Sequence, residues 1–413
     1  MTPAEFIDRN PGKLLGRLQE LVGLSTVNPP GENYERTTAW LVEELEAVGV
    51  RTRRYPIPSA WMKRELPPEL RGHPRFNVLG KLPVPGAKKT LHFNAHFDVV
   101  PVSGKWMHGS PFSGAIDRGW IYGRGTADMK GSIASLLMAV RALRAANVTP
   151  KLNIEISFTA DEETDSALGA GWLVTKAPIK PDYAVVMEGG EGRTVCCGHN
   201  GTLWLEVQVH GKAAHGSLPH KGVNALEKMS ALVRAFGRYK RTLATRGWRT
   251  PEGKVHRPTI NLGGVFHCGE GAKINTVPAH ASFTIDRRVL PVEQHAAAER
   301  ELRAFIAASA REIPDCRVSV RKISENFSCF SEPTHPFFTT MAGCVTRVRK
   351  EDTLFNVSTG FNDMHFFSHH LRIPTIGYGP GGLDYHGVNE RAQVKELLAS
   401  AKIYAELMAT FGG

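Results

Sequence analysis

The sequence predicts an α/β protein in which a mixed, mostly parallel sheet is covered by helices and interrupted by a smaller α+β domain. Before residue 200 and after residue 325, short apolar segments alternate with helical segments, a rhythm typical of parallel sheets. From Gly201, apolar and polar residues alternate with period two, as in an antiparallel strand with one exposed face. We therefore expect one domain at residues 1–200 and 325–413 and an inserted domain at residues 201–324.

The N-terminal segment predicts two helices and a strand. Thr2 and Glu5 have the spacing of a capping box, and apolar residues recur at helical spacing over residues 6–22, so we expect the chain to begin with a helix. A second amphipathic pattern covers residues 32–48 and ends at a glycine, which often terminates helices. An extended segment over residues 50–55 follows.

The rest of the first domain alternates strands and helices. Short apolar strands are expected at residues 77–80, 90–95, 152–159 and 183–187. A helix is expected at residues 131–146, and residues 57–76, rich in Pro, Arg and Glu, are expected to form an irregular loop. After the inserted domain, the pattern predicts a helix at 336–348, strands at 353–358 and 374–378, and a helix at 390–411.

The inserted domain opens with the alternating segment at residues 203–210. Its other expected elements are helices at 223–236 and 292–310 and strands at 259–265, 281–286 and 317–323.

Composition excludes several classes of protein. The chain has 413 residues, 42% of them hydrophobic, which is enough for a large core without disulfides. Its six cysteines are irregularly spaced, which favours reduced thiols and a cytoplasmic location. The N-terminus does not resemble a signal peptide, and the longest apolar stretch is far shorter than the ~20 residues that span a bilayer. The net charge of +11 is spread over short basic clusters, so no nucleic-acid or membrane partner is expected.

Polar side chains follow the expected strands. His96 and Asp98 come directly after the strand at residues 90–95, where open α/β sheets present ligand-binding residues. An aspartate at this spacing can orient a metal-binding histidine through a hydrogen bond. The same triplet also arises by chance, so it needs support from other segments.

Acidic residues recur at other turns. Asp128 follows a glycine-rich turn and precedes a helix, so it is either an N-cap or a carboxylate that can bridge two cations. The acids at residues 161–163 end another strand. They form a solvated loop, or one binds metal while its neighbour activates water. Glu188 and His386 also follow strand or glycine-rich segments. Together these residues offer the nitrogen and oxygen ligands of a co-catalytic metal pair.

These motifs resemble those of the aminoacylase, acetylornithine deacetylase, succinyl-diaminopimelate desuccinylase and carboxypeptidase G family of two-metal hydrolases. The matching segments are His96–Pro101, Gly123–Gly131, Asp161–Glu163 and His386. They occur in the family's order, and the resemblance covers essentially the whole chain. It implies a catalytic domain of the phosphorylase/hydrolase-like aminopeptidase type with an inserted α+β dimerisation, or lid, domain.

The resemblance also implies a role for each residue. One or two divalent metals per subunit, zinc, cobalt or manganese, would be bound by His96, Asp128, Glu163, Glu188 and His386. His96 and Glu188 would hold one metal, Glu163 and His386 the other, and Asp128 would bridge them. Asp98 would orient His96. Glu162 would take a proton from the attacking water and return it to the leaving amine.

The inserted domain carries further matches, at residues 211–217, 275–278 and 286–288. By the resemblance, this domain forms a homodimer, and His215 stabilises the oxyanion in the neighbouring subunit's site. Arg288 would bind a substrate carboxylate, assisted by Asn275. The sequence leaves open a plain surface pair between Arg288 and Asp286.

The implied function is hydrolysis of an amide C–N bond next to a free carboxylate in a small-molecule substrate. The family often has a Gly-Gly-Thr-Asp segment near the substrate, where this chain has Thr359-Gly360-Phe361-Asn362-Asp363. Gly360 is the expected substrate contact. Because Phe361 and Tyr385 replace small residues, an alternative is hydrolytic deamination of an aromatic amino acid or amine. A non-catalytic binding protein is a third hypothesis, which the complete ligand set opposes.

Two other clusters are interpreted as structural. His365 and His369 have the i, i+4 spacing of helical neighbours, and Cys196 and Cys197 are adjacent, with His199 nearby. We expect packing roles for both clusters, because adjacent cysteines are poorly spaced for tetrahedral chelation.

Overall fold

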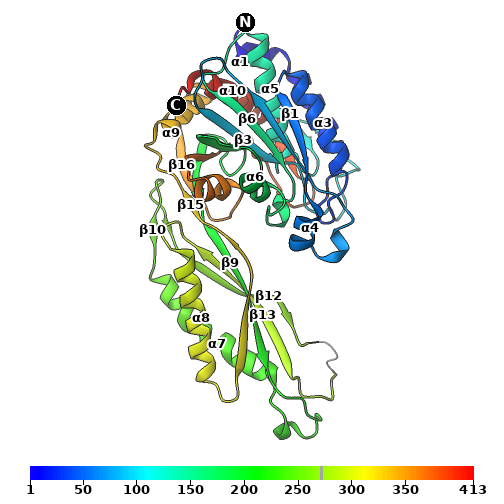
Figure 1. The fold of residues 1–413 in the computed structure, drawn as a ribbon, viewed down its shortest axis with the longest axis vertical. Helices are drawn as coiled ribbons and strands as arrows, with labels where there is room; N and C mark the ends of the chain where they lie inside the picture. Colours follow the sequence, from blue (N-terminus) through cyan, green and yellow to red (C-terminus); the bar gives the residue numbers. More distant parts are fainter. Residues whose placement is uncertain (270–272) are drawn as a thin grey trace. The chain divides into compact units, whose positions relative to one another are not determined.

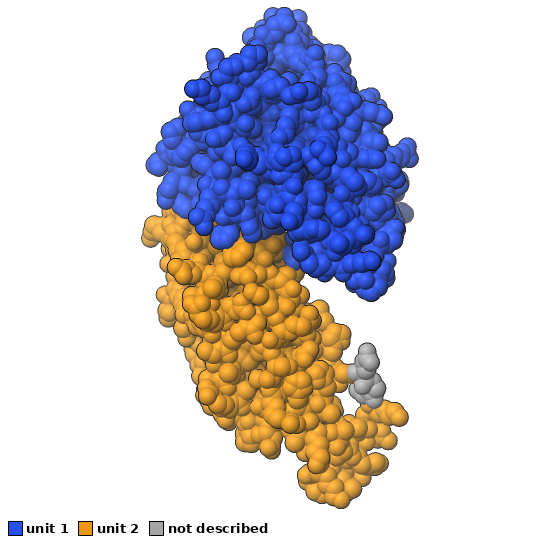
Figure 2. Space-filling model, in the orientation of Figure 1, with its two compact units in different colours: residues 1–198, 330–356, 362–413 blue, residues 199–329, 357–361 orange. Residues whose placement is uncertain are grey.

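The computed structural model describes residues 1–269 and 273–413. The chain divides into two compact units (Figure 2): unit 1 comprises residues 1–198, 330–356 and 362–413, and unit 2 comprises residues 199–329 and 357–361. Each unit has its own hydrophobic core.

Unit 1 is built on a nine-stranded mixed sheet (Figure 1). Its order is β1 (Arg51–Pro56), β2 (Phe76–Leu82), β6 (Asn153–Thr159), β3 (Thr90–His96), β7 (Tyr183–Val186), β17 (Thr375–Gly377), β8 (Thr194–His199) and β15 (Cys329–Phe330), with β16 (Leu354–Ser358) paired to β8. The four central strands, β6, β3, β7 and β17, are parallel. The antiparallel strands β1 and β2 extend one side, and β8 pairs antiparallel on the other. The expected mixed sheet with a parallel centre is confirmed.

The parallel centre brings three strand ends to one edge. His96 on β3 lies opposite Thr159 on β6, and Asn94 lies opposite Val186 on β7. The polar segments that follow β3, β6 and β7 therefore emerge side by side, at the edge where open α/β sheets bind ligands.

Helices cover this sheet. α5 (Lys130–Ala145) packs against α2 (Pro11–Gly23) and α10 (Val394–Thr410), and α9 (Pro336–Arg349) packs on α10. α3 (Tyr34–Ala47) packs on β1 and β2. The capping box of Thr2 and Glu5 is confirmed.

The chain begins with a helix, as expected, but the helical pattern over residues 6–22 is divided between two helices. The segment forms two helices, α1 (Pro3–Arg9) and α2, which is separated from it at Asn10. Pro11 lacks the N–H group that would continue the first helix and is favoured in the first turn of a new one.

Two further expectations for unit 1 need correction. Residues 57–76 are not wholly irregular, because α4 (Ser59–Glu65) and a 3₁₀ turn (Pro68–Leu70) lie within them. Met62 and Leu66 are buried there against Trp172. The C-terminal helix begins at Val394 instead of residue 390, because residues 391–393 form β18.

A small three-stranded sheet was not expected. It consists of β4 (Ala115–Asp117), β5 (Trp120–Tyr122) and β18 (Arg391–Gln393), with β5 in the middle. Arg391 pairs with Tyr122 across β18 and β5. This pairing joins the segment that leads to Asp128 to the segment that follows His386.

Unit 2 is an antiparallel sheet with helices packed on it (Figure 1). The strand order is β12 (Thr259–His267), β13 (His280–Val289), β9 (Gly201–His210) and β14 (Arg317–Asn326). α7 (Ala225–Ala244) and α8 (His295–Arg311) share a core with these strands. A two-stranded ribbon, β10 (Trp248–Arg249) and β11 (Val255–His256), lies between α7 and β12. Every helix in the described part of the chain lacks the length and apolar character needed to cross a membrane.

Candidate metal centre

Three predicted metal ligands meet at the edge of the unit 1 sheet. His96 ends β3, Asp128 lies in the turn before α5, and Glu163 lies in a 3₁₀ turn (Glu162–Thr164) after β6. Each offers one ligand atom, and these atoms lie within 4.8 Å of one another. One imidazole and two carboxylates are ligands that zinc, cobalt and manganese accept.

His386 joins this cluster from the far end of the chain. Its Nε2 atom lies 3.2 Å from Asp128 Oδ2 and 3.2 Å from Glu163 Oε2. On the other side, His96 Nε2 lies 3.1 Å from Asp128 Oδ1. Each oxygen of the Asp128 carboxylate therefore faces a different imidazole, which is the arrangement that a carboxylate shared by two cations requires.

Glu188 provides a test of whether a cation fits here. Its Oε1 atom is buried, and it has no hydrogen-bond partner among the residues described. Burial raises the pKa of Glu188 well above its ordinary value, while the nearby charge of His96 lowers it. A buried carboxylate oxygen without a partner is costly. A metal cation would supply the missing partner, so the donor set fits a metal.

The charges of the cluster also fit a bound metal cation. Burial alone would raise the pKa of Asp128, but hydrogen bonds with His386 and His96 hold it well below its ordinary value. Hydrogen bonds with Asp128 and Glu163 raise the pKa of His386 to about 10. The imidazoles are thus the only positive partners of these carboxylates among the described residues of the cluster, and a divalent cation could take over that role.

Glu162 differs from its neighbour Glu163. Its Oε2 atom lies 4.0 Å from His96 Nε2, whereas Glu163 contacts His386. Burial, followed by the charge of Glu188, raises the pKa of Glu162 well above its ordinary value. A carboxylate with a raised pKa beside a group of candidate metal ligands is suited to proton transfer.

Asp98 holds the turn that carries both glutamates. Its carboxylate accepts hydrogen bonds from the backbone N–H groups of Glu162 and Glu163, each at 3.2 Å. Asn28 Nδ2 donates to the same carboxylate at 3.0 Å. His96 Nδ1 lies 3.0 Å from the backbone oxygen of Asp98 and 3.5 Å from its carboxylate. Asp98 thus contacts both His96 and the glutamate turn.

A buried ion pair that the sequence did not reveal holds the start of this turn. Arg75 Nε donates to both carboxylate oxygens of Asp161, at 2.9 and 2.8 Å, and both side chains are buried. Tyr34 Oη and Asn28 Nδ2 donate to Asp161 at 3.0 and 3.1 Å. Asp161 therefore anchors the turn to the protein interior, and it is not a solvated loop residue.

Replacing Arg75 with methionine is expected to lower the free energy of unfolding by roughly 3–5 kcal/mol, because the carboxylate of Asp161 would stay buried without its cation. Chemical denaturation monitored by circular dichroism measures this change. The matched control is Arg64→Met, which removes an exposed pair with Glu65 and should cost about 1 kcal/mol or less. Equal effects of the two substitutions would contradict this assignment.

The predicted substrate residues of unit 2 lie in two places. His215 Nδ1 is 2.7 Å from Ser217 Oγ, and Gly216 N donates to the backbone oxygen of Asn275 at 2.7 Å. Arg288 instead lies on β13, where it donates to Asp286 Oδ2 at 3.2 and 3.0 Å. This is the pair with Asp286 that the sequence left open beside a substrate-binding role for Arg288.

The distance between these two places follows from the strand. Arg288 stands eight residues after His280, the first residue of β13, which corresponds to about 26 Å at the usual rise of a strand. Asn275 precedes β13, and its neighbours bond to the loop after β9. Within one chain, Asn275 and His215 therefore lie at the opposite end of the sheet from Arg288.

Gly360, the expected substrate contact, and the two aromatic residues that depart from the family pattern each have a defined contact. The N–H group of Gly360 donates to Ser358 Oγ at 3.1 Å. Phe361 packs edge-on against Trp204, with ring centroids 6.3 Å apart. Tyr385 is 46% exposed, and its hydroxyl donates to Glu191 Oε2 at 3.0 Å.

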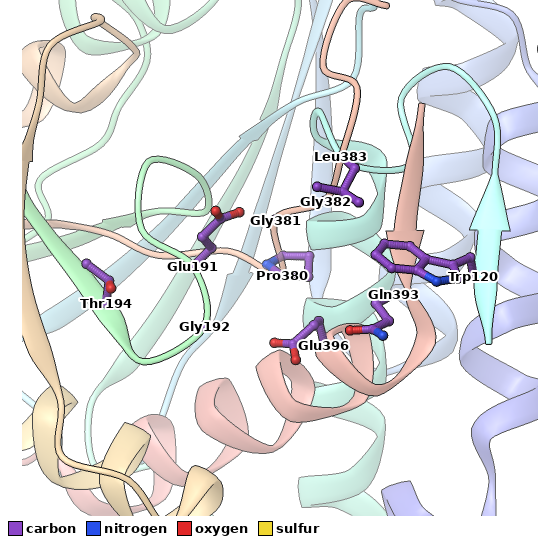
Figure 3. A pocket seen from close by; sticks show the side chains of 10 residues that line it. All are labelled: Trp120, Glu191, Gly192, Thr194, Pro380, Gly381, Gly382, Leu383, Gln393 and Glu396. Carbon is purple, nitrogen blue, oxygen red and sulfur yellow. The ribbon is translucent and has the colours of Figure 1, made fainter. Parts of the chain in front are cut away.

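A separate pocket of about 340 Å³ lies in unit 1 (Figure 3). It is lined by residues 191, 192, 194 and 380–383, together with Trp120, Gln393 and Glu396. None of these residues belongs to the predicted ligand set. Glu191 links the pocket wall to Tyr385, the neighbour of His386.

The two clusters interpreted as structural lie outside the metal group. His369 and His370 lie in a π-helical turn (Phe366–His370) that follows His365, and Cys196 and Cys197 are buried on β8. Within the described residues, the group able to hold a metal comprises His96, Asp128 and Glu163 and includes neither cluster.

Residues 92–410 match peptidase family M20/M25/M40 over most of the chain. The chain belongs to this family. It is accordingly a metal-binding hydrolase that acts on C–N bonds, and the resemblance drawn from the sequence motifs is confirmed.

Individual relatives agree with this assignment. The chain is 28% identical to the succinyl-diaminopimelate desuccinylase of Paracoccus denitrificans over 81% of this chain and 86% of the relative. It is 34% identical to the acetylornithine deacetylase of Proteus mirabilis over 61% of this chain and 59% of the relative. The fold is similar to that of an M20 family metallo-carboxypeptidase from Sulfolobus solfataricus, with a TM-score of 0.77, 20% identity, and 96% and 98% of the two chains covered.

Proposed function

We propose that this protein is a two-metal amidohydrolase that cleaves an amide bond next to a free carboxylate, as in an N-acyl amino acid or at the C-terminus of a peptide. The observation that carries the proposal is the Asp128 carboxylate, which faces His96 with one oxygen and His386 with the other. His96 and Glu188 would hold one metal, and Glu163 and His386 the other. Relatives named as a desuccinylase and a deacetylase support an acyl-group substrate.

The residues of this chain divide the chemistry between them. When bound, divalent metal ions polarise the scissile carbonyl and lower the pKa of water, so that a water molecule can lose a proton and act as a nucleophile near neutral pH. Glu162 removes the proton of the attacking water and delivers it to the leaving amine, because its raised pKa makes it a better base than an ordinary carboxylate. Asp98 keeps Glu162 in reach by holding the backbone of its turn.

Unit 2 supplies substrate recognition in this proposal, and it does so from two chains. Arg288 presents a planar guanidinium that can bind a carboxylate through two parallel hydrogen bonds. His215 and Asn275 lie at the His280 end of β13, and His280 is about 26 Å from Arg288 along the strand. This separation is too large for one small substrate to contact Arg288 and His215 of the same chain. A homodimer formed through unit 2 would let His215 and Asn275 of one subunit meet the substrate bound by the other.

Replacing Arg288 with alanine is expected to raise KM for carboxylate-bearing substrates by about 10-fold to 100-fold, the loss of one charged hydrogen-bonding partner. Steady-state kinetics on an N-acyl amino acid and on its carboxamide analogue measure the effect. The analogue lacks the carboxylate, so its kinetics should change little. The control is Arg321→Ala, which removes a comparable pair with Glu206 on neighbouring strands. Two results would contradict this role. One is that Arg321→Ala loses the preference for the carboxylate over the carboxamide, and the other is that Arg288→Ala keeps that preference.

A second candidate reaction is hydrolytic deamination of an aromatic amino acid or amine on the same metal scaffold. Tyr385 favours it, because this half-exposed aromatic ring adjoins His386. Phe361 offers less support, because it packs against Trp204. Ammonia release from aromatic amines, without amide cleavage, would identify this reaction.

A further inference from the structure

Arg124 and Glu390 form a buried ion pair beside the metal centre. Arg124 Nη1 lies 2.6 Å from Glu390 Oε2, and the two side chains are 2% and 0% exposed. The residues are 266 positions apart in the sequence. They meet because Arg124 follows β5 and Glu390 precedes β18, the neighbouring strand of the small sheet.

The Glu390 carboxylate holds the turn that carries Asp128. Its Oε1 atom accepts hydrogen bonds from the backbone N–H groups of Gly125, Ala127 and Asp128, at 3.0, 2.9 and 3.1 Å. Three donors that converge on one buried oxygen fix the path of the backbone. The position of the Asp128 carboxylate follows from that path.

The Arg124 guanidinium holds the other side of the centre. While Nη1 pairs with Glu390, Nη2 donates to the backbone oxygen of His386 at 3.0 Å. His386 has φ 58°, in the left-handed region that residues other than glycine seldom adopt. A backbone in this conformation needs support from its surroundings, and the hydrogen bond from Arg124 provides part of it.

We propose that Arg124 and Glu390 are positioning residues that set the affinity of the metal bound by Glu163 and His386. This inference rests on the proposed two-metal function. The pair acts through Asp128 and His386 and does not touch the substrate. His96 ends β3 and Glu188 follows β7, and the hydrogen bonds described for the pair do not involve either residue. Loss of the pair would disturb Asp128, which both sites share, and also His386, which belongs only to the second site. It should therefore weaken the site of Glu163 and His386 more than the site of His96 and Glu188.

The variants are chosen to separate positioning from folding. The double variant Arg124→Met/Glu390→Gln removes both charges together, because a single removal would leave one buried charge unpaired. In addition, Arg124→Lys keeps the positive charge but replaces the planar fork with a single ammonium group. The control is Arg349→Met, which breaks the pair with Glu396, also at 2.6 Å and with side chains 11% and 21% exposed. That pair joins α9 and α10, and Arg349 donates to Glu396 and Tyr378, neither of which is a predicted ligand.

The experiment is a zinc titration of the metal-free full-length protein in competition with a chromophoric chelator, with circular dichroism to confirm folding. We expect wild type and Arg349→Met to bind two zinc ions. Each variant of the pair should bind the first ion up to about 10-fold more weakly than wild type, through the shared Asp128, and the second about 100-fold more weakly. Unchanged binding of both ions in a folded variant, or equal weakening of both, would overturn the proposal.

Failure of the proposed function gives a different result. Wild-type protein that binds two zinc ions but cleaves no amide would refute the proposed reaction. The role of Arg124 and Glu390 would still be decided, because no turnover enters the titration. A wild-type protein that binds a single zinc ion would overturn both proposals.

Discussion

Replacing Glu162 with glutamine is expected to lower kcat by about 10³-fold, within the range that general acid–base groups contribute. Glutamine has nearly the shape of glutamate but cannot accept a proton. Metal binding should be unchanged, because the side chain of Glu162 is not one of the proposed ligands. The measurement combines steady-state kinetics with metal analysis of the same preparation.

The neighbouring residue provides the contrast for this variant. Glu163→Gln removes a charged ligand that contacts His386, so it should lose both metal and activity. Two adjacent glutamates would then give different patterns of loss. Glu162→Gln that keeps more than a tenth of wild-type kcat, or that loses metal as Glu163→Gln does, would contradict the assignment of Glu162 as the base.

Replacing Asp128 with asparagine is expected to reduce the affinity for both metal ions, because its carboxylate contacts both imidazoles. A ligand that binds only the folded state stabilises it by about 2.7 kcal/mol when present at 100 times its Kd. Zinc should therefore raise the Tm of wild type and have little effect on Asp128→Asn. Differential scanning calorimetry with and without zinc measures this difference.

Asp117→Asn is the matched control for this substitution. Asp117 lies on β4 of the small sheet and is half-exposed, outside the metal cluster. It should respond to zinc as wild type does. A zinc-induced rise in Tm that is the same in Asp128→Asn as in wild type would show that Asp128 does not hold metal.

The central features of the fold and the metal cluster could be predicted from local patterns. His96, Glu163 and Glu188 each follow a short apolar strand, and parallel strands bring such ends to one edge. His386 follows a glycine-rich segment, and its place beside Asp128 came from the family resemblance.

The supporting ion pairs could not be predicted in this way. Arg75 and Asp161 are 86 residues apart, and Arg124 and Glu390 are 266 apart. Nothing in the local sequence distinguishes these charged residues from exposed ones. The small sheet was missed for a related reason, because its strands of three residues are too short to show a period. In each case, the partners are far apart in the sequence, so local patterns contain no signal for the contact.

The most direct test of the central claim is amine release from an N-acyl amino acid as metal-free protein is titrated with zinc, cobalt or manganese. We predict no turnover without metal and a rise in turnover that is complete at two equivalents per chain. The rise should be absent in Glu162→Gln. Turnover that is independent of metal, or metal-dependent release of ammonia from aromatic amines without any amide cleavage, would contradict the account.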